Sequence, residues 1–92
     1  MATGNTSSHG TFGQIPGQMG SPSHTHSAPY HGIVIQGVMT HGVKGDKNPP
    51  QLGVGSHWYM PGNVAHISAC VSKEPCLFYI YSDAKFDYAA AN

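Results

Sequence analysis

Apolar positions in this chain occur in short runs that alternate with polar positions, and glycine or proline interrupts nearly every run. Alternation with a period of two, in runs rich in β-branched and aromatic residues, predicts strands, and no segment has a helical period. The predicted strands are Thr11–Gln14, Gly20–His26, Gly32–His41, Gln51–Tyr59, Val64–Val71 and Leu77–Tyr81, with Phe86–Tyr88 as a further candidate. Short strands separated by evenly spaced turns predict an all-β barrel or sandwich.

The length of 92 residues predicts one domain with a single modest core. Residues 1–10 are rich in Ser, Thr, Gly and Asn, which predicts a flexible tail ahead of a domain over residues 11–92. A barrel this short has few strands and therefore an exposed edge, which a second copy of the chain can cover. We therefore expect a homodimer.

Charged residues are scarce, with four Lys, no Arg, four acidic residues and a formal net charge of zero. A chain without a basic face is not expected to bind nucleic acid, and no apolar run approaches the length of a membrane span. Scarce charge, small polar residues and two cysteines favour a secreted protein. Cys70 and Cys76 flank a turn-like segment, where they form either a disulfide or two buried thiols.

Histidines carry the candidate chemistry. His24 and His26 are two residues apart, so on a strand both point to the same face. His66, from a distant strand, can complete a set of three nitrogen ligands, which suits zinc, copper, iron or nickel. Structural histidines are the alternative. The other internal histidines, which we expect to be solvent-exposed, are His31, His41 and His57.

These residues resemble the first motif of the cupins, small β-barrels in which it has the form G-x5-H-x-H-x3-4-E-x6-G. His24 and His26 fit the paired histidines, and Gly37 fits the closing glycine. Gly20 lies two residues closer to His24 than the motif requires. Tyr30 stands where the motif has its glutamate, which in the family commonly supplies a carboxylate ligand.

The second cupin motif has the form G-x5-P-x-G-x2-H-x3-N, and Gly55, Pro61 and His66 fit it at the expected spacing. Asn63 replaces the glycine, and asparagine is the residue best able to imitate glycine in a left-handed turn. Cys70 replaces the closing asparagine. The resemblance covers about residues 12 to 82 and implies a small cupin barrel, a double-stranded β-helix of jelly-roll type.

Replacement of the glutamate by Tyr30 leaves an all-nitrogen histidine set, which favours copper over iron, with nickel and zinc as further candidates. If Tyr30 points inward, strand parity directs Gln36 inward as well, so we expect Gln36 to be the fourth ligand. Tyr30 is then expected to act in catalysis, by hydrogen-bonding a bound oxygen species or a substrate.

Trp58 and Tyr59 precede the second motif, and alternation buries one of them. An aromatic ring at the barrel mouth can pack on a sugar, so both are candidate substrate-binding residues. The chain is similar to small copper-dependent cupins that cleave cellulose oxidatively, which implies a polysaccharide substrate with O2 or H2O2 as co-substrate. The alternatives are an iron or nickel dioxygenase or a metal-assisted lyase acting on a small molecule, and a non-catalytic binding module. A closed barrel favours a small molecule, whereas an open mouth with an exposed aromatic ring favours a polymer.

Overall fold

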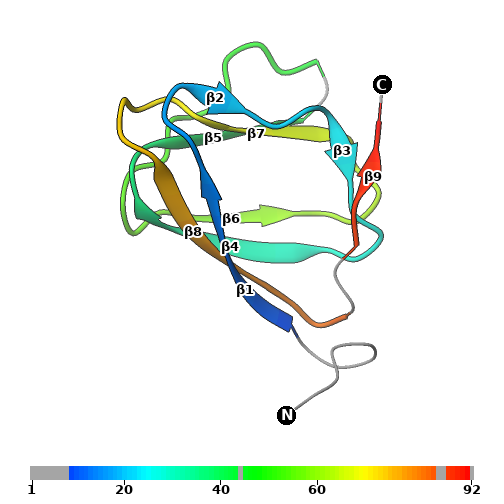
Figure 1. Ribbon diagram of the computed structural model, residues 1–92. Coiled ribbons are helices and arrows are strands. Elements are labelled where there is room, and N and C mark those ends of the chain that lie inside the picture. The colour runs from blue at the N-terminus through cyan, green and yellow to red at the C-terminus, as the bar shows by residue number, and fades with distance from the viewer. Residues whose placement is uncertain (1–8, 44, 85–86, 92) are drawn as a thin grey trace.

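The computed structural model describes residues 9–43, 45–84 and 87–91, and these residues form only strands and loops (Figure 1). The strands are β1 (His9–Ile15), β2 (Met19–Gly20), β3 (His24–Thr25), β4 (Tyr30–Gln36), β5 (Met39–Val43), β6 (His57–Met60), β7 (His66–Cys70), β8 (Cys76–Ser82) and β9 (Ala89–Ala90). The predicted all-β class is confirmed. Residues 1–8 of the expected tail lie outside the described residues, but His9 and Gly10 belong to β1.

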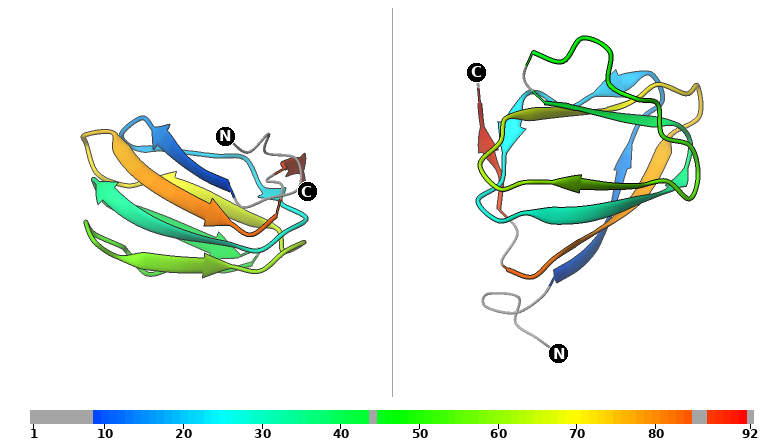
Figure 2. Two further views of the ribbon diagram at one scale, coloured as in Figure 1. Left: turned by 90° about the horizontal axis from the view of Figure 1, so that it is seen from below. Right: turned by 180° about the vertical axis from the view of Figure 1, so that it is seen from behind.

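Two antiparallel sheets curl around a common interior (Figure 2). One sheet has the strand order β1-β8-β4-β6, and the other has the order β2-β7-β3-β9 with β5 also paired to β7. Successive residues of a strand alternate between the two faces of its sheet, so one face of each sheet lines the interior. Within the described residues, no helix has the length and apolar character needed to cross a membrane.

A sharp corner at Gly37 divides the predicted strand Gly32–His41 between the two sheets. Gly37 has a φ of +85°, which side-chain-bearing residues rarely adopt, and a Cβ there would lie 2.7 Å from the sulfur of Cys76. The chain therefore leaves the first sheet after β4 and enters the second as β5. Apolar residues stand on both sides of the corner, which is why the sequence pattern predicted a single strand.

The core lies between the sheets and is built around Trp58. Its indole covers Gly32 of the neighbouring strand, where a Cβ would lie 2.3 Å from the indole ring. Only glycine leaves room for the ring at this position. The buried apolar side chains are Tyr30, Val34, Met39, Trp58, Met60, Cys70, Cys76 and Ile80.

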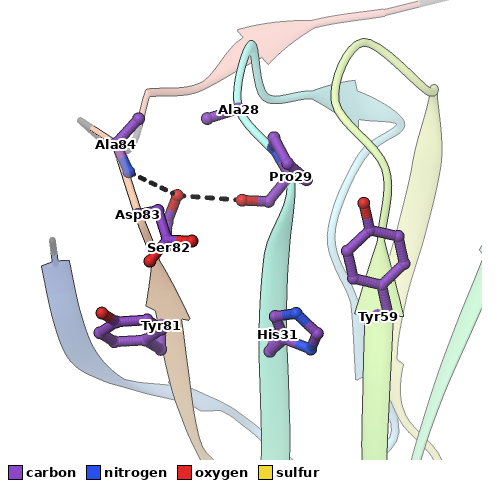
Figure 3. A pocket seen from close by; sticks show the side chains of 8 residues that line it. All are labelled: Ala28, Pro29, His31, Tyr59, Tyr81, Ser82, Asp83 and Ala84. Carbon is purple, nitrogen blue, oxygen red and sulfur yellow. Dashed lines mark hydrogen bonds between the residues drawn. The ribbon is translucent and has the colours of Figure 1, made fainter.

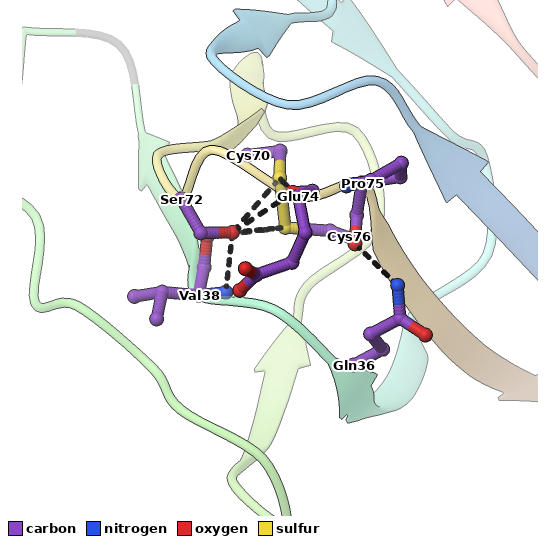
Figure 4. Close-up of a disulfide and its surroundings, with 7 residues drawn as sticks. All are labelled: Gln36, Val38, Cys70, Ser72, Glu74, Pro75 and Cys76. Carbon is purple, nitrogen blue, oxygen red and sulfur yellow. Dashed lines mark hydrogen bonds between the residues drawn. A yellow bond between two sulfur atoms is a disulfide. The ribbon is translucent and has the colours of Figure 1, made fainter.

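A disulfide joins Cys70 at the end of β7 to Cys76 at the start of β8 (Figure 4). Of the two alternatives that the sequence left open, the structure has the disulfide. Its sulfur atoms lie in the core, and the Ser72 hydroxyl between the two cysteines accepts the backbone N–H of Val38 at 3.1 Å. The bridge therefore fixes the β7–β8 turn against the corner between the two sheets.

Candidate metal centre

Three histidines from the second sheet converge in the interior. His24 lies on β3 directly opposite His66 of β7, and His26 follows two residues later on the same side of the chain. All three side chains are buried, and their ligand atoms lie within 4.8 Å of one another. His24 and His26 therefore point to the same side, as strand alternation predicted.

Backbone carbonyls fix the orientation of all three imidazoles. The Nδ1 atom of His24 lies 2.8 Å from the carbonyl oxygen of Pro22, and that of His66 lies 2.9 Å from the carbonyl oxygen of Val64. The Nδ1 atom of His26 is hydrogen-bonded to the carbonyl oxygen of Asp87. A carbonyl oxygen can only accept, so each Nδ1 carries a proton and donates it.

Each ring consequently has its lone pair on Nε2, which is the metal-binding atom of such a neutral imidazole. Among the described residues, Nε2 of His66 is fully buried and has no hydrogen-bond partner. A buried polar atom without a partner is unfavourable unless an ion or molecule from outside the chain binds it. A metal ion held by three Nε2 atoms would do so, and the donor set fits zinc, copper, iron or nickel.

The electrostatic environment keeps the ligand set in its metal-binding form. Burial lowers the pKa of His26 and of His66, and the neighbouring histidines lower both further. These two rings are therefore neutral at neutral pH, which is the form that coordinates a metal.

Tyr30, expected from the motif to act in catalysis, lies beside the histidines. Its ring meets that of His26 edge-on at 5.3 Å between centroids, and the Trp58 indole N–H donates a 3.2 Å hydrogen bond to its phenol oxygen. Burial raises the pKa of Tyr30 despite this hydrogen bond. Tyr30 is therefore a neutral phenol at neutral pH in the protein without metal.

His24, His26 and Tyr30 line one cavity of about 280 Å³. Trp58 also lines it, but as a buried core residue and not as an exposed ring at an open mouth. The remaining lining residues are Gly13, Ile15, Ser21, Ser68, Phe78, Ile80 and Tyr88. The cavity is largely apolar with a polar cluster at one end, which is the usual composition of a small-molecule site.

The C-terminal segment contributes two residues that sequence reasoning missed. Asp87 accepts hydrogen bonds from the backbone N–H and the hydroxyl of Ser27, each at 2.7 Å, and these bonds lower the pKa of its carboxyl. Tyr88 stacks on the ring of His24 at 4.8 Å. Figure 1 shows the segment running beside β3. Asp87 and Tyr88 lie outside both motifs, so only the fold reveals their place.

Gln36 does not reach the histidines, so its prediction as fourth ligand is wrong. A register shift between Val34 and Gln36 breaks the alternation of β4, and Gln36 becomes exposed. Its amide donates instead to the carbonyl of Pro75 at 3.0 Å, as Figure 4 shows. Strand alternation correctly places Tyr30 in the interior, but it no longer applies beyond the bulge.

Tyr59 lies on the opposite face of its strand from Trp58 and is not part of the cavity. It is exposed and packs beside His31 at 4.9 Å between ring centroids, in a separate hollow of about 240 Å³ on the outer face of the first sheet (Figure 3). Its predicted role in substrate binding at the histidine site is therefore not supported by its position.

His31 and His57 are exposed, as expected. His41 was also expected to be exposed, but it is largely buried. Its ring stacks on Trp58 at 3.7 Å with an angle of 14°, and its Nδ1 lies 2.9 Å from the Ser68 hydroxyl. Burial lowers the pKa of His41 to about 3. The corner at Gly37 explains the error. Because the chain turns there, the alternation along β4 does not predict which side chains of β5 point inward.

A family model described as "Domain of unknown function (DUF4437)" matches residues 3–92. No curated protein matches the chain.

Solved structures similar to this chain are cupins. A DMSP lyase, DddQ, from Ruegeria pomeroyi DSS-3 aligns with a TM-score of 0.81 at 18% identity, over 95% of this chain and 44% of the lyase. An oxalate oxidase aligns with a TM-score of 0.82 at 15% identity, over 92% of this chain and 46% of the oxidase.

An RmlC-like cupin with a double-stranded β-helix fold from Methanocaldococcus jannaschii has a TM-score of 0.76 at 23% identity, over 88% and 74% of the two chains. The likeness confirms the predicted cupin barrel. The chain spans less than half the length of the lyase and of the oxidase.

Proposed function

The chain belongs to the DUF4437 family, and we propose that it is a metal-dependent enzyme that converts a small molecule inside its barrel. One observation carries the proposal. Three histidines with carbonyl-fixed tautomers converge, and two of them, His24 and His26, line a cavity of about 280 Å³ together with a buried phenol. The site therefore combines a set of metal ligands with the Tyr30 phenol, which can hydrogen-bond a molecule bound in the cavity.

Among the described residues three protein nitrogens converge, so a metal bound by them would keep part of its coordination sphere open. A metal there would polarise a substrate oxygen as a Lewis acid, or exchange electrons if it were copper or iron. The chain itself supplies Tyr30, whose phenol gives a proton to the bound molecule or hydrogen-bonds it. The apolar walls exclude water and orient the rest of the substrate.

Cavity size and relatives both support a small substrate over a polymer. Neither ring that the sequence offered for a sugar chain is an exposed ring at the cavity, because Trp58 is buried and Tyr59 is on the outer face. The similar structures include proteins named DMSP lyase, oxalate oxidase and polyketide cyclase. We therefore prefer a metal-assisted lyase or an iron or nickel oxygenase to copper-dependent cleavage of cellulose.

The test is a matched series of metal-loaded proteins and substrates. The metal-free chain is reloaded separately with Fe(II), Ni(II), Cu(II) and Zn(II), and each form is incubated with DMSP, oxalate and glycolate, and with cellulose plus ascorbate and H2O2. Oxygen uptake distinguishes an oxidative reaction from a lyase. Turnover of a small molecule that is lost in His66→Ala and kept in the exposed control His57→Ala supports the proposal. Turnover of cellulose alone, or turnover that survives His66→Ala, contradicts it.

A further inference from the structure

The outward face of the first sheet carries aromatic and aliphatic side chains, whereas a sheet face that is open to water is normally polar. The strand pairings align its outward residues in two rows, here called the outer rows, which cross β1, β8, β4 and β6 in that order. The first row is Gly10, Tyr81, His31 and Tyr59, and the second row is Phe12, Tyr79, Ile33 and His57. Neither row contains an acidic residue, a lysine or an arginine.

Contacts along the sheet hold the rings of the outer rows in place. The Tyr79 phenol lies over Gly10, where a Cβ would be 1.7 Å from its oxygen, and the Phe12 ring packs on Tyr79 at 5.0 Å between centroids. The rings of His31 and Tyr59, which Figure 3 shows on neighbouring strands, lie 4.9 Å apart between centroids. Because these rings already pack on one another, little side-chain freedom is left to lose when a partner covers them.

The exposed apolar area of this face approaches the area that a stable interface requires. Phe12, Tyr59 and Tyr81 are each exposed to between 41% and 67%, and Ile33 is exposed to 40%. At about 200 Å² for each large side chain, these four leave roughly 400 Å² open, about half of the roughly 800 Å² that each partner contributes to a typical interface. The exposed His31 ring and the other members of the outer rows extend the patch towards that size.

The absence of charge in the outer rows indicates what kind of partner fits them. Nucleic acids and anionic membranes are bound through basic residues, and a strongly charged protein needs opposite charges to face it. A second copy of the chain brings the same uncharged face, so two copies meet without opposing like charges and without burying an unpaired charge. Aromatic residues with few charges are typical of the centre of an interface, and Asp83, in the hollow beside Tyr81, is at the edge of the face where a polar rim is expected.

A sugar chain is the other uncharged candidate, because it stacks on aromatic rings. A sugar also needs hydrogen-bonding groups around the rings, and the second outer row places the apolar Phe12 and Ile33 there. A second copy is therefore the better fit, and sugar binding is the competing outcome of the experiment below.

We infer that two copies of the chain pack face to face through their outer rows, related by a two-fold axis. The contact then lies on the face of the first sheet and not on the open strand edge that the sequence predicted. Packed sheets lie about 10 Å apart, so side chains of both copies interdigitate, and the hollow of about 240 Å³ beside His31 receives a side chain of the partner. The contact is independent of the proposed function, because the histidine cavity lies on the inner side of this sheet.

The first test compares the same substitution on the outward faces of the two sheets. Ile33 on β4 and Ile67 on β7 are exposed to 40% and 46%, and each points away from the core. In a two-fold interface a substitution appears on both sides, so Ile33→Lys opposes like charges, whereas Ile67→Lys places its charge on the other sheet. Sedimentation velocity over a dilution series measures the dissociation constant of each protein.

We expect the wild type to be dimeric at about 100 μM and Ile33→Lys to raise the dissociation constant by more than about 100-fold. Ile67→Lys should dissociate like the wild type. A wild type that stays monomeric at this concentration overturns the inference, as does a dimer that Ile33→Lys leaves intact or that both variants weaken equally. A monomer whose Ile33 methyl signal shifts on addition of cellohexaose would show that the face binds a sugar instead.

The second test needs no variant and decides the inference if Ile33→Lys does not fold. Wild-type chain with carbon-13-labelled isoleucine methyl groups is mixed with unlabelled chain, and isotope-filtered NMR detects contacts between the two copies. We expect contacts from aromatic protons of the unlabelled copy to the Ile33 methyl groups and none to those of Ile67. Contacts at Ile67 alone, or none at either residue, would overturn the inference. Neither test depends on whether the three histidines bind a metal.

Discussion

Two groups of histidines in this barrel use the same side chain in opposite ways. Inside, each of His24, His26 and His66 donates from Nδ1 to a backbone carbonyl, so that Nε2 carries the lone pair. On the outer face of the first sheet, Nδ1 of His31 lies 2.9 Å from Nε2 of His57, so these two rings hydrogen-bond each other. The outer rings also stack at 5.0 Å between centroids and are exposed to water.

The difference shows that proximity of imidazoles does not by itself make a metal site. The outer pair satisfies itself, and its two rings are free to choose tautomers and to reorient in water. The inner set is held in one tautomer by the backbone and is buried, and the Nε2 atom of His66 has no partner among the described residues, which suits it to bind a metal.

Removal of one inner histidine should abolish tight metal binding. We expect His66→Ala to weaken the affinity for Zn(II) by more than about 100-fold, beyond the effect of losing an outer-shell partner. His57→Ala, the same substitution in the outer pair, should leave the affinity within about 2-fold. Competition titration with a chromogenic chelator measures both variants. Equal losses in the two would mean that the inner and outer groups do not differ as described.

The buried His41 should make the fold sensitive to acid. The unfolded chain protonates His41 below about pH 6.5, whereas burial lowers its pKa in the folded chain to about 3. The free energy of unfolding should therefore fall as the pH falls through this window, by up to about 1.4 kcal/mol per pH unit, and level off above it.

His41→Phe should flatten this dependence, leaving the smaller slope caused by the lowered pKa values of His26 and His66. Urea midpoints across the window measure the slope, with His57→Phe as the control for an added aromatic ring. A slope equally steep in His41→Phe would show that His41 is not the residue being protonated.

The disulfide should stabilise the fold without contributing to the metal site. Cys70 and Cys76 are six residues apart, and closing so short a loop in the unfolded chain is worth about 2 kcal/mol. The double variant Cys70→Ser, Cys76→Ser should lose about that much stability in urea unfolding. Its metal stoichiometry should equal that of the wild type, and a loss of metal in the folded variant would contradict the separation of the two regions.

The smallest effect should come from the C-terminal segment. Asp87→Asn removes the charge from a carboxylate that holds Ser27, beside the carbonyl that fixes His26. We expect a loss of about 10-fold in Zn(II) affinity, as for other outer-shell partners. Asp83→Asn, an exposed acid in the outer hollow, is the matched control and should change nothing. Affinity unchanged in Asp87→Asn would show that the backbone alone fixes His26.

The sequence sufficed for the parts of the site that depend on strand alternation and turn chemistry. His24 and His26 share a face as predicted, and Asn63 has the left-handed conformation, with φ of +60°, expected of the residue that replaces the motif's glycine. Its backbone N–H donates to the carbonyl of His26, which joins the second motif to the first. Such local rules act over a few residues and are visible in one segment at a time.

The parts that could not be predicted depend on how segments meet. The bulge before Gln36 and the corner at Gly37 break the alternation, and neither is signalled by the apolar pattern around them. Asp87 acts through its backbone carbonyl, which every residue type possesses, so no motif records it. The expected homodimer and secretion are properties beyond a single folded chain, and both stay predictions.

The central claim is that the three inner Nε2 atoms, and not the outer pair, form the metal site. It is tested most directly by loading the metal-free chain with one equivalent of Cu(II) as a probe and counting coordinated imidazoles by pulsed electron paramagnetic resonance. We predict one species bound by three imidazoles, unchanged in the double variant His31→Ala, His57→Ala and lost in His66→Ala. A signal that survives His66→Ala and disappears in the double variant would contradict the account.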